Sequence, residues 1–293
     1  MRREWYGRDT GLSARMFITL FLLAVVYLAF LAVMLAAGLD YTLMFLIAFA
    51  LLGAQYFFSD KLVLWTMGAR EVSAEEAPEL HGTIERLVAL ADLPKPRIAV
   101  VESSMPNAFA TGRSPRNAVV AVTTGLMERL EQPEVEAVLA HELSHIRNRD
   151  VMVMTLASFF STVAYFLMRI GLSGAGRRGR GGGAAAIFIV SILVWIISFF
   201  LIRALSRYRE LAADRGSAII TGAPSQLASA LIKISGTMQR IPQRDLREVE
   251  GMNAFFILPA AHGSSRFELF STHPSLEKRL ERLKRMEQEM ERQ

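Results

Sequence analysis

Four long apolar runs constrain the fold of this chain more than any other feature of its sequence. They extend over Met16 to Ala37, Tyr41 to Phe58, Val151 to Ile170 and Ala184 to Ile202, and the only charged residue within them is Arg169. At about 1.5 Å per residue, each run would extend roughly 27–33 Å as a helix, close to the thickness of the hydrocarbon core of a bilayer. One such run can be a buried core helix. Four of them, each flanked by charge, indicate two membrane hairpins.

The charges around the first hairpin predict its orientation. Four arginines precede the first run: Arg2, Arg3, Arg8 and Arg15. Lys61 and Arg70 follow the second run, whereas the link between the two runs carries only Asp40. Because basic residues accumulate on the cytoplasmic side of membrane spans, we expect both ends of this hairpin in the cytoplasm. The link of the second hairpin, residues 171–183, is also rich in arginine, which leaves a shallow or re-entrant hairpin open there.

Removal of the apolar runs leaves two polar blocks, 61–150 and 204–293, which together approach the size of a typical domain. We therefore expect one globular unit that is preceded by the hairpin 1–60 and interrupted by the hairpin 151–203. The chain has no cysteine, which excludes disulfides and thiolate metal ligands. Its net charge of +5 is concentrated beside the apolar runs, so the expected partner is an anionic lipid bilayer; no nucleic-acid-binding motif is present, and we expect no nucleic-acid partner.

The first polar block combines helical patterns with short strand-like runs. Ser73 and Glu76 have the spacing of a capping box and predict the start of a helix that Pro94 ends. Pro133 predicts the start of a second helix. Between the two lie three strand-like runs, separated by proline, asparagine, glycine and serine: Arg97 to Glu102, Ala108 to Thr111, and Asn117 to Thr123.

The second polar block is helical throughout. Helices are expected over 206–222 and 223–235, and the chain closes with an amphipathic helix whose charged residues we interpret as a solvated face. Its apolar residues recur at three- and four-residue spacing: Leu276, Leu280, Leu283, Met286 and Met290. The two blocks together predict an α+β domain of helices with a small sheet.

The helix expected after Pro133 carries the sequence His141-Glu-Leu-Ser-His145. Side chains four residues apart project from the same face of a helix, and two neutral imidazoles at that spacing can bind one Zn²⁺. Glu142 lies roughly 100° around the helix from His141, where a carboxylate can take a proton from zinc-bound water and pass it to a leaving amine. The motif therefore predicts two metal ligands and a general base.

A hydrolytic zinc site needs a third protein ligand, and the residues after His145 offer no further histidine. Glu210 is the best candidate, because it lies on a predicted helix with Asp214 four residues later on the same side. Asp214 would accept the second ring N–H of a ligand histidine and fix its tautomer. The pattern alone leaves open that Glu210 is a solvated helix residue.

Four sequence segments, which follow one another as they do in that family, resemble the HtpX-type membrane zinc metalloproteases, which are relatives of the prenyl-protein endopeptidases. They are "HELSHIRNRD", "SRYRELAAD", the upstream "NAFATG" and "STHPSLEKRL" near the end of the chain. The resemblance extends over nearly the whole chain and includes both apolar hairpins. It implies a zincin-like protease domain interrupted by a transmembrane hairpin, with one Zn²⁺ per chain bound by His141, His145 and Glu210, and Glu142 as the catalytic base.

The resemblance also implies where the substrate binds. The segment Asn107, Ala108, Phe109, Ala110, Thr111 and Gly112 would form an edge strand to which an extended polypeptide adds by backbone pairing. His273 is implied to lie near the active site, where it would stabilise the oxyanion that forms as water attacks the peptide carbonyl. Arg207 and Tyr208 are alternatives for that role.

These features predict a multi-pass protein of the cell (inner or plasma) membrane whose protease domain faces the cytoplasm. Its substrates would be polypeptides, and quality control of misfolded membrane proteins is the expected role. Two alternatives remain. A site-2-type intramembrane protease would bury the histidine motif within an apolar span, but here the apolar residues begin only after the motif. A non-catalytic membrane scaffold would use zinc structurally, which usually requires four protein ligands.

Overall fold

The computed structural model describes residues 9–36, 41–174, 182–240, 257–258 and 269–292. The chain divides into two compact units, each assembled from segments that are far apart in the sequence. One unit contains Met1–Arg8, Phe58–Val151 and Arg209–Gln293, and the other contains Asp9–Phe57 and Met152–Tyr208. We call them the polar unit and the apolar unit.

The apolar unit consists of long helices. They are α1 (Thr10–Ala36), most of α2 (Tyr41–Thr66), α6 (Asp150–Gly174) from Met152 on, and the first part of α7 (Gly182–Thr221). Its core is formed by side chains of α1, α6 and α7: Leu23, Tyr27, Phe30, Met34, Ala157, Ala164, Val194 and Leu205. Many other large apolar side chains point outward, such as Phe17 at 70% exposure. An apolar surface of this extent suits lipid and not water.

Among the described residues, three helices are long and apolar enough to cross a membrane: Thr10–Ala36, Asp150–Met168 and Phe188–Thr221. They correspond to three of the four predicted runs. The fourth run, Tyr41 to Phe58, forms most of α2, but many of its side chains lie outside the described residues. So do residues 175–181, which contain most of the arginine-rich link.

In the described part of the polar unit, four strands form one sheet with the order β1-β2-β4-β3. Their bounds are Ala69–Glu71, Arg97–Val101, Ala108–Thr111 and Val119–Thr123 for β1 to β4. β2 and β4 are parallel, with Ala99 paired to Ala121, and both outer pairs are antiparallel. The valine-rich β4 is buried along its whole length, as expected for a central strand that is covered on both faces.

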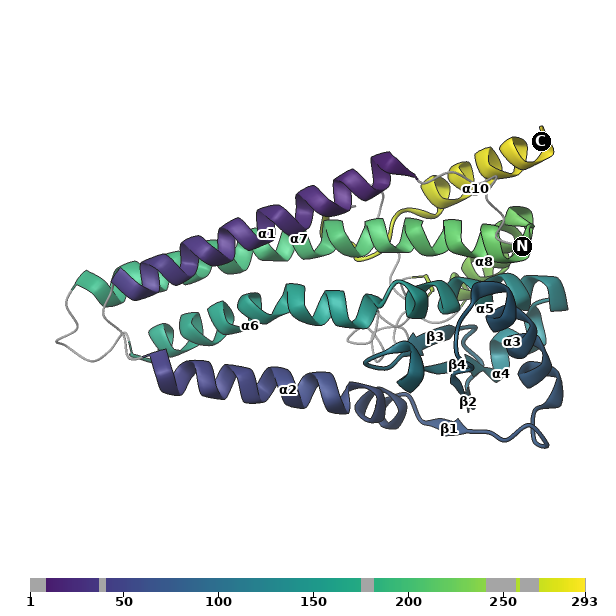
Figure 1. Ribbon diagram of the computed structural model, residues 1–293, viewed down its shortest axis with the longest axis horizontal. Helices are drawn as coiled ribbons and strands as arrows, with labels where there is room; N and C mark the ends of the chain where they lie inside the picture. The colour runs from purple at the N-terminus through teal and green to yellow at the C-terminus, as the bar shows by residue number, and fades with distance from the viewer. Residues whose placement is uncertain (1–8, 37–40, 175–181, 241–256, 259–268, 293) are drawn as a thin grey trace. The chain divides into compact units, whose positions relative to one another are not determined.

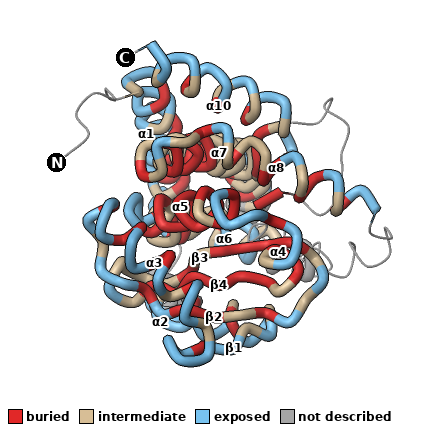
Figure 2. The backbone as a smooth tube through the Cα atoms, turned by 90° about the vertical axis from the view of Figure 1, so that its right-hand side faces the viewer, coloured by how far each residue is buried: buried red, intermediate tan, exposed pale blue. Residues whose placement is uncertain are grey.

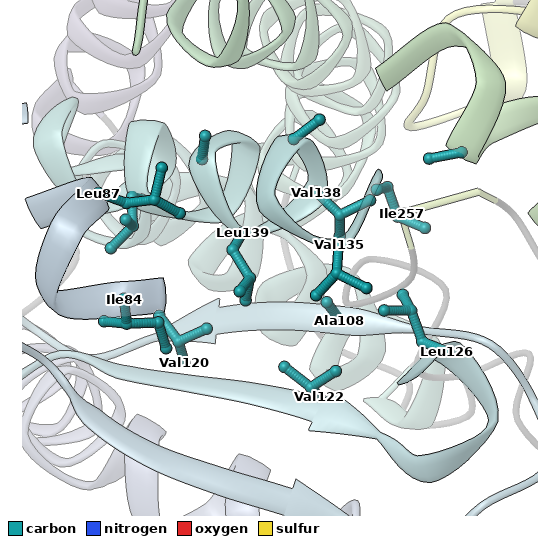
Figure 3. Packing of buried hydrophobic residues seen from close by; sticks show 14 of the residues in the cluster. Ile84, Leu87, Ala108, Val120, Val122, Leu126, Val135, Val138, Leu139 and Ile257 are labelled. Carbon is teal, nitrogen blue, oxygen red and sulfur yellow. The ribbon is translucent and has the colours of Figure 1, made fainter. Parts of the chain in front are cut away.

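Helices cover both faces of this sheet. On one face, Ala108, Val120 and Val122 meet α3 (Pro78–Ala91) and α5 (Gln132–Arg147), whose side chains Val135 and Leu139 point toward the strands (Figure 3). On the other face, Leu64 from the end of α2 packs with five strand residues: Ala99, Val101, Phe109, Val119 and Ala121. Burial is accordingly nearly continuous along β3 and α5 (Figure 2).

In the part of this unit that the structure describes, three further helices follow: α4 (Thr124–Arg129), α8 (Pro224–Met238) and α10 (Leu276–Glu291). The structure confirms the small sheet among helices and corrects some boundaries. Ser73 and Glu76 do exchange hydrogen bonds, but they close a turn, and α3 begins only at Pro78, whose missing N–H suits the first helical position. Asn117 belongs to a short 3₁₀ turn (η1, Pro115–Asn117), so β4 begins two residues later than predicted.

The predicted helix over 206–222 is the last part of the long helix α7, which runs without a break from the apolar unit into the polar unit (Figure 1). The sequence explains this continuity, since no proline or glycine occurs between Ala184 and Arg215. The residue proposed as the third ligand is therefore on the same helix as one of the apolar runs.

Candidate metal centre

Helix α5 places His141, Glu142 and His145. It begins with a capping box between Glu131 and Glu134, in which each side chain accepts a hydrogen bond from the backbone of the other residue. Because Val135 and Leu139 hold one face of α5 on the sheet, the two histidines four residues apart lie together on another face, with ring centroids 4.8 Å apart. Both His141 and Glu142 are buried.

Helix α7 brings Glu210 to the histidines through very close packing on α5. Ser217 of α7 donates a hydrogen bond of 2.6 Å to the carbonyl of Ala137. One residue earlier, Gly216 leaves room for Ser144: a Cβ atom at position 216 would lie 2.2 Å from the Ser144 Oγ. Only glycine permits this approach of the two helices, and Glu210 lies on the same helix, toward its apolar end.

The ligand atoms of His141, His145 and Glu210 all lie within 4.8 Å of one another, so the three residues could hold a metal ion. The two Nε2 atoms are 3.2 Å apart, and the Glu210 oxygens lie 3.7 Å from the first and 3.4 Å from the second. A tetrahedral zinc ion with bonds of about 2.0–2.1 Å separates its donors by about 3.3 Å. The donor set and its spacing therefore fit one ion of this kind.

The first histidine is supported by a chain of buried charged groups. His141 Nδ1 lies 3.0 Å from Asp214 Oδ1, and the Asp214 carboxylate accepts two hydrogen bonds from Arg279, of 2.9 and 2.6 Å. Arg279 is fully buried and also donates to the carbonyl of Ile257. Burial alone would lower the pKa of His141, but Asp214 and Glu210 raise it to about 9. The carboxylates thus favour positive charge here, as a proton or as a bound cation.

The second histidine has an equivalent support from different elements. His145 Nδ1 lies 2.6 Å from Asp150 Oδ2, and Asp150 forms an ion pair with Arg209. Arg209 is buried and also donates a 2.8 Å hydrogen bond to the carbonyl of Asn148, at the end of α5. In both imidazoles, therefore, Nδ1 faces an aspartate and Nε2 faces Glu210.

Glu142 lies beside the cluster without belonging to it. Burial raises the pKa of this carboxyl group, while the two histidines and a hydrogen bond from the backbone N–H of Ala110 oppose the shift. A raised pKa brings a carboxylate closer to the range in which it exchanges protons at neutral pH. The contact with Ala110 also places β3 next to Glu142.

The segment predicted to bind substrate forms β3 and its two flanking residues. β3 pairs with β4 on one side, and within the described part of the chain no strand pairs with its other side. Asn107 is buried and accepts a hydrogen bond from the Ile257 N–H, so it anchors the start of the strand. Gly112 ends it with a φ of 123°, where an added Cβ would lie 2.3 Å from the Asn117 carbonyl oxygen.

His273 lies next to the third candidate ligand. It is buried, and its Nδ1 is 3.2 Å from the Glu210 Oε2. Arg207 and Tyr208, the alternatives for the same role, precede Glu210 on α7 and belong to the apolar unit.

Three charged residues of the site were missed from the sequence: Asp150, Arg209 and Arg279. For Arg279 a signal existed, because it lies three residues after Leu276 and four before Leu283, on the apolar face of the last helix. The sequence predicts a solvated face for the charge run around it, whereas Arg279 is 0% exposed.

Comparison with known proteins now identifies the family. The model of peptidase family M48 matches residues 74–287. A "Protease HtpX homolog" of Moorella thermoacetica is 63% identical, with 99% of each chain covered. "Protease HtpX homolog 2" of Methanosarcina acetivorans is 60% identical, covering 99% of this chain and 100% of that protein.

The fold is also similar to the crystal structure of Ste24p from S. mikatae, with a TM-score of 0.54 over 92% of this chain and 67% of that chain. The sequences of these two proteins are 18% identical, so this likeness concerns the fold alone. The family match and the relatives confirm the resemblance indicated by the four sequence segments. The chain therefore belongs to peptidase family M48 and is a membrane metalloprotease.

Proposed function

We propose that the chain is a zinc-dependent endopeptidase that binds one Zn²⁺ through His141, His145 and Glu210. The observation that carries this proposal is the convergence of three buried or half-buried donors at tetrahedral spacing, drawn from two helices that are separated in sequence by an apolar hairpin. The absence of cysteine leaves histidine and carboxylate as the available protein ligands, and two histidines with one glutamate are a typical catalytic set.

Zinc at this position would act as a Lewis acid that polarises the scissile carbonyl and acidifies a water molecule. Glu142 is proposed as the general base that accepts a proton from water and delivers it to the leaving amine. Its burial beside the two histidines and its raised pKa support this role. Asp214 is proposed to hold His141 in one tautomer, which the 3.0 Å approach to Nδ1 supports.

We propose that polypeptide substrates bind along β3, from Asn107 to Gly112. The backbone N–H of Ala110 donates to Glu142 and therefore points away from β4. In an antiparallel strand the carbonyl of a residue lies on the same side as its N–H, so the Ala110 carbonyl points away from β4 as well. An extended peptide paired to this edge would have its backbone next to the catalytic carboxylate. Recognition through the backbone requires little sequence preference, which suits the removal of diverse polypeptides.

His273 is proposed to stabilise the oxyanion of the tetrahedral intermediate. Its contact with Glu210 Oε2 supports a place at the edge of the metal centre and would also restrain the ligand carboxylate. Zinc content distinguishes the two contributions: a lost oxyanion donor lowers turnover with zinc still bound, while a lost restraint weakens zinc binding.

We further propose that the active site faces the cytoplasm at the inner or plasma membrane and acts in quality control of misfolded membrane proteins. The basic residues flanking the first hairpin support the orientation. The short sequence distance from His145 to Asp150, where a candidate span begins, supports a site close to the bilayer.

Because the chain has no cysteine, single cysteines at positions 39 and 281 can be labelled with a membrane-impermeant maleimide. Position 39 should react in intact cells, and position 281 only after the membrane is opened.

The test of the enzymatic proposal compares purified wild-type protein with Glu142→Gln and Glu210→Ala. Wild type should contain one zinc per chain and cleave casein, and Glu142→Gln should keep its zinc but lose cleavage. Glu210→Ala should lose both. If Glu142→Gln cleaves at the wild-type rate, the assigned base is wrong; if wild type binds zinc but cleaves nothing under any condition, a structural zinc in a membrane scaffold is the better account.

A further inference from the structure

Asp150 and Arg209 form a buried ion pair next to the metal centre that the proposed mechanism does not use. Asp150 is the first residue of α6, and Arg209 lies on α7 directly before Glu210. The side chains are 10% and 7% exposed, so the pair is shielded from water. Burial of two charges is costly unless both are paired and hydrogen-bonded, which indicates that the surroundings hold them in a defined arrangement.

The pair is directed at His145. Asp150 Oδ2 lies 2.6 Å from the Nδ1 of His145, while the Nε2 of the same ring faces Glu210 Oε1 at 3.4 Å and His141 Nε2 at 3.2 Å. A carboxylate at Nδ1 keeps the proton on that nitrogen and leaves the lone pair of Nε2 for a cation. It also restrains the rotation of the ring about its Cβ–Cγ bond.

The backbone between the two helices is shaped to bring Asp150 to this position. α5 ends at Arg147, and Arg149 then adopts a left-handed conformation with a φ of 56°, which is unfavourable for a residue that is not glycine. Asp150 directly follows this residue, and its carboxylate lies beside the ring of the histidine five residues earlier. Strain of this kind persists where the surrounding structure enforces it, often at functional sites.

Arg209 fixes the other side of the carboxylate. Besides its ion pair with Asp150, it donates a hydrogen bond to the Asn148 carbonyl within the same turn. One arginine of α7 thus holds both the acceptor for His145 and the end of α5, and the next residue along α7 is the candidate ligand Glu210.

We propose that Asp150, held by Arg209, is a positioning residue for His145 and sets the affinity of the metal centre. The inference rests on the proposed zinc site. Because Asp150 begins α6 and Arg209 lies on α7, the two helices that carry the second apolar hairpin are connected to the ligands by side-chain contacts within the polar unit.

The experiment measures zinc affinity of the full-length protein in detergent by competition with a chromophoric chelator. All variants carry Glu142→Gln, so that self-cleavage does not disturb the measurement. Asp150→Ala should weaken zinc binding about 10–100-fold. Asp150→Asn, which keeps an acceptor for His145 but loses the charge, should have an intermediate effect, and Arg209→Met a smaller one than Asp150→Ala.

Asp60→Ala is the matched control. Asp60 is also a buried aspartate paired to an arginine, with Arg97 at 2.8 Å, but it packs at the end of α2 and contacts no candidate ligand. The zinc affinity of the Asp60→Ala variant should stay within about twofold of that of the Glu142→Gln parent, since the ion pair of Asp60 involves Arg97 and none of the three candidate ligands. An unchanged zinc affinity in Asp150→Ala or Asp150→Asn would overturn the inference about Asp150, while the proposed zinc site itself would stand. A parent protein that binds no zinc would instead refute the proposed function. Should Asp150→Ala fail to fold, Asp150→Asn and Arg209→Met decide the question.

Discussion

The two histidines of the metal centre have the same kind of support, a carboxylate backed by an arginine, but the two supports are built in different ways. The His141 support uses Asp214 of α7 and Arg279 of α10, so its three members are distant in sequence and almost fully buried. The His145 support uses Asp150, five residues away across a tight turn, and Arg209. The first depends on the assembled domain, and the second largely on local geometry. Equal chemistry can therefore have unequal consequences for stability.

The largest difference is expected between the two arginines. Arg279→Leu leaves the buried Asp214 without its bidentate partner and should lower the free energy of unfolding by about 3–5 kcal/mol. Arg209→Leu should cost less, about 1–3 kcal/mol, because Arg209 and Asp150 are less deeply buried than Arg279 and Asp214. Both can be measured by urea unfolding in detergent on the Glu142→Gln background. Lys284→Leu, on the exposed face of α10, is the control and should change stability by less than about 0.5 kcal/mol. Equal losses for the two arginines would remove the distinction.

His273 extends the His141 support, because it contacts the same oxygen of Glu210 that faces His141. His273 is proposed to donate a hydrogen bond to the oxyanion. His273→Ala should therefore lower kcat about 100–1000-fold with zinc stoichiometry unchanged. Steady-state cleavage of a fluorogenic peptide and metal analysis of the same sample check this. Loss of zinc together with activity would instead show that His273 restrains Glu210.

The contact between α5 and α7 is shared by both supports, so its disturbance should affect them together. Gly216→Ala forces a Cβ to within 2.6 Å of the Ser144 Cβ and should destabilise the domain by about 1–3 kcal/mol while weakening zinc binding. Gly236→Ala is the control: it lies on α8 with no atom within 4 Å of the added methyl, and should stabilise by up to about 1 kcal/mol. Ser144→Gly combined with Gly216→Ala should restore part of the zinc affinity. No effect of Gly216→Ala would mean that the helices tolerate a wider separation.

The smallest effect is expected remote from both supports, at the start of α5. Glu134 accepts hydrogen bonds from Lys233 and Ser229 of α8. Burial alone would raise the pKa of Glu134, but these bonds and the Glu131 N–H lower it below 4.5. A lowered folded-state pKa gives stability that is present above about pH 4.5 and lost as the pH falls through the folded value. Wild type should therefore unfold at a higher temperature than Glu134→Gln at about pH 7, and the difference should narrow toward about pH 4. A difference independent of pH would contradict the assignment.

Local patterns made much of this architecture predictable. The apolar runs, the strand Ala108–Thr111, the α5 helix and its two histidines all follow from composition and spacing within short windows. Glu210 was accessible only as a candidate, because no rule of local spacing relates it to histidines more than sixty residues earlier, and the resemblance supplied what spacing did not.

What could not be predicted depends on contacts between distant segments. Arg279 occupies a position in the apolar pattern of α10, but an arginine is assigned to the solvent unless its partner Asp214 is known to be buried opposite it. In the sequence Asp150 is only the residue before an apolar run, and its contact with His145 depends on the turn at Arg149 and on the ion pair with Arg209. β1 has three residues and is defined by its pairing with β2, which leaves no pattern to detect.

The most direct test of the metal centre is X-ray absorption spectroscopy of the zinc-loaded Glu142→Gln protein. The proposed site predicts two imidazole nitrogens and one carboxylate oxygen at about 2.0–2.1 Å, with one further light atom from solvent, and Glu210→Ala should abolish the signal of bound zinc. A spectrum with three imidazoles, which would require His273 as a ligand, or an unchanged spectrum in Glu210→Ala, would contradict it.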